Sequence, residues 1–590
     1  MAFDDIFEVM SGAGWYQVTI YMLLGLPSFY GGVQSIIMSF LGPDQEHWCY
    51  VPRLQEYCHD VQRHVAIPLT DDGEYDRCHY YDLPYDNLTD EQIANWNRSY
   101  TDNTATIPCE SWYYDQTEYY RTIVSDYDLV CDKSWLVQMA YSVNLAAKLI
   151  MGVVGGILAD KYGRKPLMVV GACTSIFFVF GSAYAQTYGG FILGRTLLFC
   201  TVVLTYATGF ILPIEIFAPE KRFIPGGFYW IYWSIGFMTV PAMAYFVRDS
   251  VKLQLAAGVP MILQIAYVWL VPESPRWELT QGKQEKCNQT LRFIAEVNQD
   301  EVPDKVYESL EPDQQNSESQ ESFWSLVKLA FGSRTLRRRF LLTLPAWAGC
   351  NIVYYGLSYN TGALSGNLYV NTAMSGFVEI PANLLTLYLL TKAGRKYTLA
   401  IFLILAGLAN FICIPFIYTS DELDWLLVTF SMLGKACITV AFTTLCFFAL
   451  ELFPTSVRAL MYNASALIGG SFSLIAPFMG PPLISIWKPL PLIIFGALGV
   501  VSGALVFLLP DTSKADLPDT ILDAEELGTE KERRREAEVD DSKTKDNESG
   551  YGSVRHRGAH NAAYEDDETG SDMNLTKTAS SVQTPDCSRM

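Results

Sequence analysis

The sequence predicts an all-α membrane protein with twelve transmembrane helices in two pseudo-symmetric six-helix bundles. Half of the 590 residues are apolar, and the mean hydropathy is positive although the formal net charge is −21. The charged residues concentrate in 41–134, 272–340 and 511–590, and the remainder consists of runs of roughly 20 apolar residues. A helical run of that length crosses the hydrocarbon core of a bilayer, so this segregation indicates a polytopic protein embedded in lipid.

Twelve such runs follow one another along the chain. They lie near residues 17–40, 135–158, 167–186, 190–212, 224–247, 251–271, 340–362, 370–391, 398–418, 425–449, 461–484 and 488–510. The connecting segments carry Lys161, Arg164, Lys165, Lys221, Arg222, Lys392, Arg395, Lys396 and Arg458, which all fall on one side of the membrane. The positive-inside bias makes that side cytoplasmic, and an even number of spans places both termini there. We expect the plasma membrane as the location.

Four features of the first half recur in the second half. The turn Gly163-Arg164-Lys165 recurs as Gly394-Arg395-Lys396, Ile214-Glu215-Ile216-Phe217 as Leu450-Glu451-Leu452-Phe453, Pro272-Glu273-Ser274 as Pro510-Asp511-Thr512, and Gly194-Arg195 as Gly434-Lys435. All four pairs keep an offset of about 230–240 residues, which chance would rarely produce. The sequence therefore predicts a duplicated six-helix unit.

The pattern of charge divides the chain into five parts. They are a cytoplasmic N-terminus (1–16), a first bundle (17–271) with an outer loop (41–134), a cytoplasmic linker (272–339), a second bundle (340–510) and a cytoplasmic tail (511–590). We expect a helix near 283–297 in the linker. The tail is poor in large apolar residues, which predicts disorder. Its Ser and Thr residues could accept phosphate or bind cytoplasmic partners, and a purely solubilising tail explains the composition equally well.

The outer loop carries five cysteines, which are Cys49, Cys58, Cys78, Cys109 and Cys131. In an oxidising compartment they should pair into a small cap, with one thiol left over because the number is odd. A zinc site is the alternative, since four histidines lie nearby, but the ligand spacing is irregular. Asn87 and Asn97 begin glycosylation sequons on the outer side.

Several classes of function do not fit the sequence. The acidic balance leaves no basic face for a nucleic acid. No nucleophile–base pair, phosphate loop or metal cluster is evident, so we predict neither an enzyme nor a cofactor. The N-terminus lacks the basic region of a signal peptide, so the first apolar run should remain as a helix. The last four residues have prenylation spacing without its aliphatic residues, and we expect no lipid anchor there.

The segment from Gly156 to Lys165 resembles the loop signature between spans two and three of the major facilitator superfamily. Pro272-Glu-Ser-Pro-Arg-Trp277 narrows the resemblance to its sugar-porter and organic-ion branches. The large Cys-containing loop ending at Asp128-Leu-Val-Cys-Asp132, Glu451-Leu-Phe-Pro-Thr455 and Trp487-Lys-Pro-Leu-Pro-Leu492 resemble the organic cation/anion/zwitterion transporter family. The resemblance covers the chain to about residue 525. It implies the major facilitator fold, with a central substrate site opened alternately to each side.

The chain departs from that family at three places. Its outer loop has five cysteines where the family commonly has six. Thr391 stands where the second turn usually has an acid, which implies a weaker charge lock there. Gly470 falls at the span-eleven position that is an aspartate in the cation transporters and usually a base in the anion transporters. The resemblance therefore does not by itself choose between cations and anions.

Lys148 and Glu379 fall in the middle of predicted spans, where an ionisable side chain costs at least about 2.5 kcal/mol. Lys148, in span two, could hold a substrate carboxylate, or it could pair with an acid or extend toward the interface. Glu379, in span eight, matches an acidic position of the family, which implies contact with a substrate ammonium. It could also pair with Lys435 or Arg195.

Other charges suggest a conformational role. Arg195 and Lys435 occupy symmetric places, which favours a shared structural or gating function, and Asp160, Arg164 and Arg395 would lock the cytoplasmic gates. Span one contains no acid and no span contains His. This removes the obvious proton relay and favours electrogenic or exchange-type transport over proton symport.

Aromatic residues supply further candidates for a binding site. They are Tyr206 in span four, Tyr229, Trp230 and Trp233 in span five, and Trp347 and Tyr354 in span seven. A ring face attracts a desolvated ammonium by roughly 0.5–2 kcal/mol, so several rings could cage amines of different shape. The resemblance assigns Trp347 and Tyr354 to aromatic positions of the family. Packing against lipid or neighbouring helices is the alternative role for each ring.

Taken together, these residues predict a transporter of small amine-bearing organic cations or zwitterions, such as molecules like β-alanine or carnitine. The rings and Glu379 would receive the ammonium, and Lys148 would receive a carboxylate. A larger organic anion is the alternative substrate, held by Lys148, Lys435 and Arg195. A ligand sensor of the same fold that does not transport is the third possibility.

Overall fold

The computed structural model describes residues 3–526, apart from residues 4–5, 11–13, 71–72, 95, 97–103, 219–220, 309, 311–322, 365, 419–422, 513–517 and 519. The tail that is predicted to be disordered covers 511–590, and its part from residue 527 onward lies outside the described residues, as does the second sequon, at Asn97. Residues 521–526 form a short helix, because Ala524 packs into the core of the second half, so the prediction is wrong for that stretch. The described residues belong to one compact unit.

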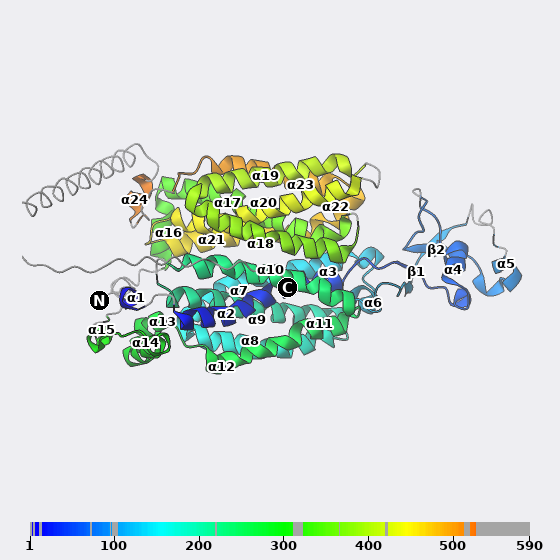
Figure 1. The fold of residues 1–590 in the computed structure, drawn as a ribbon. Helices are drawn as coiled ribbons and strands as arrows, with labels where there is room; N and C mark the ends of the chain where they lie inside the picture. Colours follow the sequence, from blue (N-terminus) through cyan, green and yellow to red (C-terminus); the bar gives the residue numbers. More distant parts are fainter. Residues whose placement is uncertain are drawn as a thin grey trace, which may run out of the picture. The chain divides into compact units, whose positions relative to one another are not determined.

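The first half of the chain supplies six membrane-length helical segments (Figure 1). They are α2 (Trp15–Ile36) continued by α3 (Met38–Leu41), α7 (Trp135–Tyr162), α8 (Arg164–Ala183), α9 (Tyr188–Ile216), α10 (Phe223–Phe246), and α11 (Ser250–Gly258) continued by η7 (Val259–Ala266) and α12 (Tyr267–Leu270). Pro260 lies at the start of the 3-10 helix η7. Because proline has no N–H to donate, the sixth span is α-helical at its two ends only.

The second half repeats the arrangement. Its helices are α17 (Arg334–Tyr359) followed by η9 (Asn360–Ala363), α18 (Leu368–Lys392), α19 (Arg395–Phe416), α20 (Asp424–Glu451), α21 (Arg458–Ser471) continued by η11 (Phe472–Met479), α22 (Pro481–Ile486) and α23 (Leu490–Val506). Ten segments of the described chain are long and apolar enough to cross a membrane; α23 is a shorter apolar helix. α17 begins six residues before the predicted boundary at 340, because the Ser333 side chain caps it by accepting from the Leu336 N–H.

The halves meet mainly along α10 against α18 and along α7 against α21 and η11. Within the first half, α2 and α10 approach closely enough to require glycine. A Cβ at Gly32 would lie 2.1 Å from the Trp233 carbonyl oxygen, and a Cβ at Gly236 would lie 1.9 Å from the Phe29 carbonyl oxygen. This close packing fixes the position of α10, which carries Trp230 and Trp233 to the boundary between the halves.

The outer loop folds as a small cap at one end of the helices, here named the cap end. β1 (His47–Cys49) pairs antiparallel with β4 (Trp112–Tyr114), and β2 (His79–Tyr81) with β3 (Thr106–Pro108). The cap also contains η2 (Pro52–Leu54), α4 (His59–Ala66), η3 (Tyr85–Asn87) and α5 (Asp90–Ala94), and α6 (Ile123–Tyr127) and η5 (Cys131–Lys133) lead into α7.

Four of the five cysteines of the cap form disulfides, Cys49 with Cys109 and Cys78 with Cys131. Cys58 is a free, exposed thiol. The prediction of two pairs and one remaining thiol is confirmed. The four bonded sulfurs are not available as thiolate ligands, so the structure favours the disulfide interpretation over the zinc alternative.

The opposite end of the helices, here named the linker end, carries short helices from the N-terminus, the linker and the segment after α23 (Figure 1). They are α1 (Ile6–Val9), α13 (Pro275–Thr280), α14 (Gln284–Asn298), α15 (Asp304–Glu308), α16 (Phe323–Gly332) and α24 (Ile521–Glu526). α14 confirms the helix predicted near 283–297. It attaches to α2, because the Tyr16 N–H donates to Asn298 Oδ1 at 3.0 Å and Asn298 Nδ2 donates to Gln17 Oε1 at 2.8 Å.

Candidate functional site

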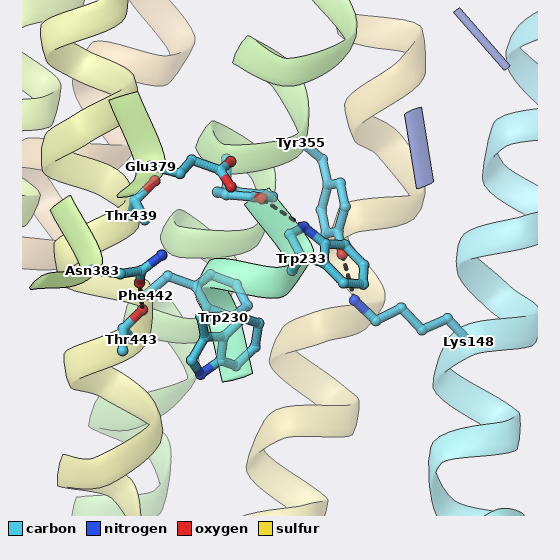
Figure 2. A pocket seen from close by; sticks show the side chains of 10 residues that line it. Lys148, Trp230, Trp233, Tyr355, Glu379, Asn383, Thr439, Phe442 and Thr443 are labelled. Carbon is cyan, nitrogen blue, oxygen red and sulfur yellow. Dashed lines mark hydrogen bonds between the residues drawn. The ribbon is translucent and has the colours of Figure 1, made fainter. Parts of the chain in front are cut away.

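A pocket lies between the two halves of the molecule and is here named the central pocket (Figure 2). It contains about 380 Å³ of empty space, part of it open to solvent. Its lining side chains are Lys148 from α7, Trp230 and Trp233 from α10, Tyr354 and Tyr355 from α17, Glu379 and Asn383 from α18, and Thr439, Phe442 and Thr443 from α20. Both bundles therefore contribute to one site of ring faces, hydroxyls and two ionisable groups.

Lys148 is a half-buried cation on the first-half side of this pocket. Its ammonium donates to Tyr355 Oη at 2.5 Å and lies 5.3 Å from the ring centroid of Trp233. No carboxylate oxygen of the described residues lies within 4.0 Å of it. Lys148 is thus held by neutral partners, and its charge is available to an anionic group in the pocket.

Glu379 faces the same pocket and is paired with Lys435. The distance from Lys435 Nζ to Glu379 Oε1 is 3.0 Å, and the two side chains are only 1% and 2% exposed. Ser234 Oγ donates to Glu379 Oε2 at 3.0 Å. Lys435 also donates to Ser358 Oγ at 2.5 Å, and its ammonium lies 3.3 Å from the Tyr354 ring centroid. These contacts tie α17, α18 and α20 together. Removing either charged partner would leave the other as an uncompensated buried charge.

Aromatic rings form much of the remaining wall. Trp233 Nε1 donates to Tyr354 Oη at 3.2 Å across the boundary between the halves. Phe442 packs against both Trp230, with ring centroids 6.3 Å apart, and Tyr354, with centroids 5.7 Å apart. Such rings can receive an ammonium on their faces, with each well-placed face contributing roughly 0.5–2 kcal/mol.

Three of the predicted aromatic residues lie next to the pocket and do not line it. Tyr229 is fully buried, and its hydroxyl donates to the Tyr206 carbonyl oxygen at 2.9 Å. Tyr206 packs against Trp233 at 5.7 Å between centroids, and Trp347 packs against Phe442 at 6.1 Å. These residues hold the lining rings in place. A direct contact of any of them with substrate stays a prediction.

Several lining residues were absent from the predicted set, and helical spacing could have found most of them. Asn383 lies four residues after Glu379, and Thr439 and Thr443 lie four and eight residues after Lys435. Residues four apart share a helix face, so each of these positions follows from a charged residue already singled out. Tyr355 and Phe442 carry no comparable signal in a single sequence.

The predicted gate residues of the first half form a compact charge cluster at the linker end. Arg164 Nη2 lies 2.8 Å from Glu215 Oε1 and 3.1 Å from Asp160 Oδ1. Glu273 Oε1 accepts from the backbone N–H groups of Arg164 and Lys165 at 2.9 and 3.2 Å. Gly163 permits this turn because its φ is +100°, a conformation that side chains disfavour.

The second-half turn has the same geometry with fewer partners. Gly394 has a φ of +78°, and Arg395 Nε lies 3.1 Å from Glu451 Oε1. Thr391, in the place of Asp160, donates its hydroxyl to the Tyr388 carbonyl oxygen at 2.8 Å. Arg395 therefore lacks the counterpart of the Arg164–Asp160 contact, as the sequence predicts.

Arg195 and Lys435 have different surroundings despite their symmetric places in sequence. Arg195 is 2% exposed and donates through Nη1 to Gln34 Oε1 of α2 at 2.7 Å. Its Nε and Nη2 have no hydrogen-bond partner in the described part of the chain. Lys435 instead binds a residue that lines the central pocket. The symmetric positions thus do not have symmetric contacts.

Comparison with known proteins places this architecture in a family. A family model described as "Sugar (and other) transporter" matches residues 91–518. The chain is 31% identical over 536 residues to a Drosophila melanogaster protein named "Organic cation transporter protein", covering 90% of this chain and 95% of that protein. It is 30% identical over 542 residues to "Solute carrier family 22 member 3" of Rattus norvegicus, covering 89% and 96%.

Solved structures support the same fold. The inward open conformation of the xylose transporter XylE from E. coli matches with a TM-score of 0.56 at 16% identity, covering 85% of this chain and 98% of that one. At 16% identity this match supports the fold alone. The proteins of this family are transporters rather than enzymes. The chain is a multi-pass membrane protein that belongs to the organic cation/anion/zwitterion transporter family of the major facilitator superfamily.

Proposed function

We propose that this protein carries small zwitterions and organic cations across the plasma membrane, with the central pocket as the substrate site. The observation that carries the proposal is that Lys148 and Glu379 line one pocket together with five aromatic residues. An ammonium would sit on the rings of Trp230, Trp233 and Phe442, within reach of Glu379. A carboxylate would accept from Lys148 in place of the Tyr355 hydroxyl.

The charge balance of the pocket favours a zwitterion among these substrates. Glu379 shares its charge with Lys435, whereas Lys148 has no carboxylate beside it in the described structure. A pure cation would therefore contact the rings and Glu379, whose charge Lys435 already compensates. A molecule with an ammonium and a carboxylate, similar to β-alanine or carnitine, would use every group in the pocket.

The same observation supports a second candidate, an organic anion transporter. Because Lys435 neutralises Glu379, the charge of Lys148 makes the central pocket net positive. An aromatic carboxylate could bind Lys148 and stack on Trp233. The two candidates differ in whether an ammonium on the substrate improves transport.

Transport would follow by alternating access, with the two halves moving about the pocket. The clusters around Arg164 and Arg395 would close the linker end, which we place in the cytoplasm with both termini. The cap, with Asn87 exposed on it, would face outward and carry the glycans predicted at Asn87 and Asn97. The absence of an acid in α2 beside Arg195, where Gln34 stands instead, supports exchange or electrogenic flux over proton symport.

The test is uptake by the purified protein in proteoliposomes. Labelled carnitine would be competed by three sets of unlabelled compounds of similar size, which are quaternary cations, zwitterions and aromatic carboxylates. We expect zwitterions to compete best and cations to follow. Strongest competition by carboxylates would replace this proposal with the anion candidate. Binding without accumulation inside the vesicles would favour a sensor.

A further inference from the structure

A second, larger cavity lies at the cap end of the second half and is here named the cap-end pocket. It contains about 1050 Å³ of empty space, part of it open to solvent. It lies within one bundle, among α17, α19, α20, α22 and α23, rather than between the halves. None of its lining residues lines the central pocket. The proposed function gives it no role.

The walls of the cap-end pocket combine an apolar floor with a polar rim. Leu357, Leu427 and Phe495 are 6%, 7% and 0% exposed and form the floor. Asp424 is half-buried at the first residue of α20, and Lys488 is exposed in the connection before α23. This size and mixture of surfaces is typical of a small-molecule site, with apolar walls and a few polar groups that orient the ligand.

The surroundings of Asp424 and Lys488 indicate whether the pocket would bind a cationic or an anionic group of a ligand. Within the described residues no ion pair forms at either Asp424 or Lys488. Lys488 can direct its ammonium into water, whereas the half-buried Asp424 carboxylate adjoins the apolar floor. An ammonium beside Asp424 would gain a charge-assisted hydrogen bond in partly desolvated surroundings.

We propose that the cap-end pocket binds an amphipathic organic cation, with its ammonium on Asp424 and its apolar body on Leu357, Leu427 and Phe495. The proposal goes beyond the proposed function, because this ligand occupies a site separate from the transported molecule. A free amphipathic amine and a lipid amine headgroup carry the same chemistry, and either is a possible source of the ammonium.

The cap-end pocket is mechanically connected to the central pocket. Ser431, which lines the cap-end pocket, lies four residues before Lys435 on α20, one helical turn away. Leu357 directly precedes Ser358 on α17. The hydrogen bond from Lys435 Nζ to Ser358 Oγ joins these two helices between the pockets. A ligand that separates α17 from α20 at the cap end therefore acts on the cluster that positions Glu379.

The test measures binding directly, so that it does not depend on transport. Hexylammonium, which can donate to a carboxylate, is titrated by calorimetry into the purified full-length protein. Leu427→Trp should fill the pocket and abolish one binding event, while the matched control Leu433→Trp, at a position on α20 that is 50% exposed, should retain it. Asp424→Asn should weaken that event about tenfold. Trp233→Ala in the central pocket should leave it unchanged.

Two further arms fix the chemistry of the ligand. Hexyl sulfate and hexyl glucoside should bind at least about tenfold more weakly than the cation, and Lys488→Gln should not weaken the cation. If phosphatidylethanolamine competes with the cation and phosphatidylglycerol does not, the result would support the site and identify a lipid amine as the source of the ammonium. If Leu427→Trp fails to fold, the change in affinity in Asp424→Asn tests whether the cation binds in the cap-end pocket.

Three results would overturn the proposal. They are equal binding of the cation and the sulfate, unchanged binding in Asp424→Asn, and unchanged binding in folded Leu427→Trp. If these binding results hold while proteoliposomes show no uptake, the proposed function fails and the cap-end site stands. If both hold, the cation should also change the affinity for the transported molecule about fivefold or more, and by the same factor in each direction.

Discussion

The role assigned to Lys148 makes a quantitative prediction about selectivity. Replacing Lys148 with Ala removes the ammonium that lies 2.5 Å from Tyr355 Oη and leaves the other lining groups in place. A hydrogen bond to a charged group contributes about 1.5–3 kcal/mol. The ratio kcat/KM for a zwitterion should therefore fall roughly tenfold to a hundredfold. A cation of the same size has no carboxylate to lose, and its kcat/KM should change less than about threefold.

The assay is initial uptake of a matched pair in proteoliposomes, with carnitine and an analogue that lacks the carboxylate. Lys148→Arg is the conservative control, because it keeps the charge and should restore part of the zwitterion uptake. Glu379→Gln is the contrasting variant. It leaves Lys435 as a buried charge without its carboxylate, so both substrates should lose uptake and the protein should lose about 3–5 kcal/mol of stability.

The reasoning about Lys148 would be refuted by an equal loss for both molecules. In that case Lys148 would be a structural residue that holds α17 through Tyr355, and the charge argument for a zwitterion would no longer apply. Uptake of the cation that rises in Lys148→Ala would be compatible with the proposal, because removing a positive charge makes the pocket more favourable for an ammonium.

Three further predictions concern the gates and the cap. Arg164→Ala should lower uptake more than Arg395→Ala, because Arg164 has two carboxylate partners at 2.8 and 3.1 Å while Arg395 has one at 3.1 Å; equal effects in a side-by-side uptake assay would contradict this. Thr391→Asp should add an i,i+4 partner for Arg395 and raise the unfolding temperature slightly, by an interaction of about 0.2–1 kcal/mol, and an unchanged melting curve would count against it. Burial lowers the pKa of His47 in the cap despite its hydrogen bond to the Gln45 carbonyl oxygen, so its stabilisation is complete above the unfolded value of 6.5 and is lost as pH falls below it. After correction for the intrinsic exchange rate at each pH, the opening free energy that hydrogen exchange measures for β1 and β4 should fall below that pH by at most about 1.4 kcal/mol per pH unit, and His47→Gln should remove this decrease.

Most of the fold could be predicted from the sequence, because lipid imposes strong rules on it. A span must be apolar and helical, and the duplicated turns around Arg164 and Arg395 marked the symmetry of the two halves. The break in the sixth span follows from Pro260, which the sequence shows, although the hydropathy of the run alone gives no sign of it. The start of α17 at Arg334 was also missed, because a polar helical extension carries no hydropathy signal.

The site was predictable in part. Lys148, Trp233, Tyr354 and Glu379 line the pocket as the sequence suggests, since charges and rings in apolar runs stand out. The pairing of Glu379 with Lys435 was one of two open alternatives, and only the packing of α18 against α20 decides between Lys435 and Arg195.

Other parts of the site could not be predicted. Tyr355 and Phe442 line the pocket, but aromatic residues are common in apolar runs, so their presence in the lining depends on helix rotation, which one sequence does not reveal. Tyr229 illustrates the converse case. It was predicted as a lining ring, yet it is turned into the core beside Tyr206.

The central claim is that the two halves move about a pocket between them. A direct measurement is uptake after a disulfide is formed across the halves between Gly227→Cys on α10 and Leu387→Cys on α18. A Cβ at Gly227 would lie 3.0 Å from Leu387 Cγ, so the two thiols can reach one another. Each single variant under the same oxidant controls for the native thiols. The account predicts that oxidation abolishes uptake in the double variant and that reduction restores it; full uptake through a completely cross-linked protein would contradict it.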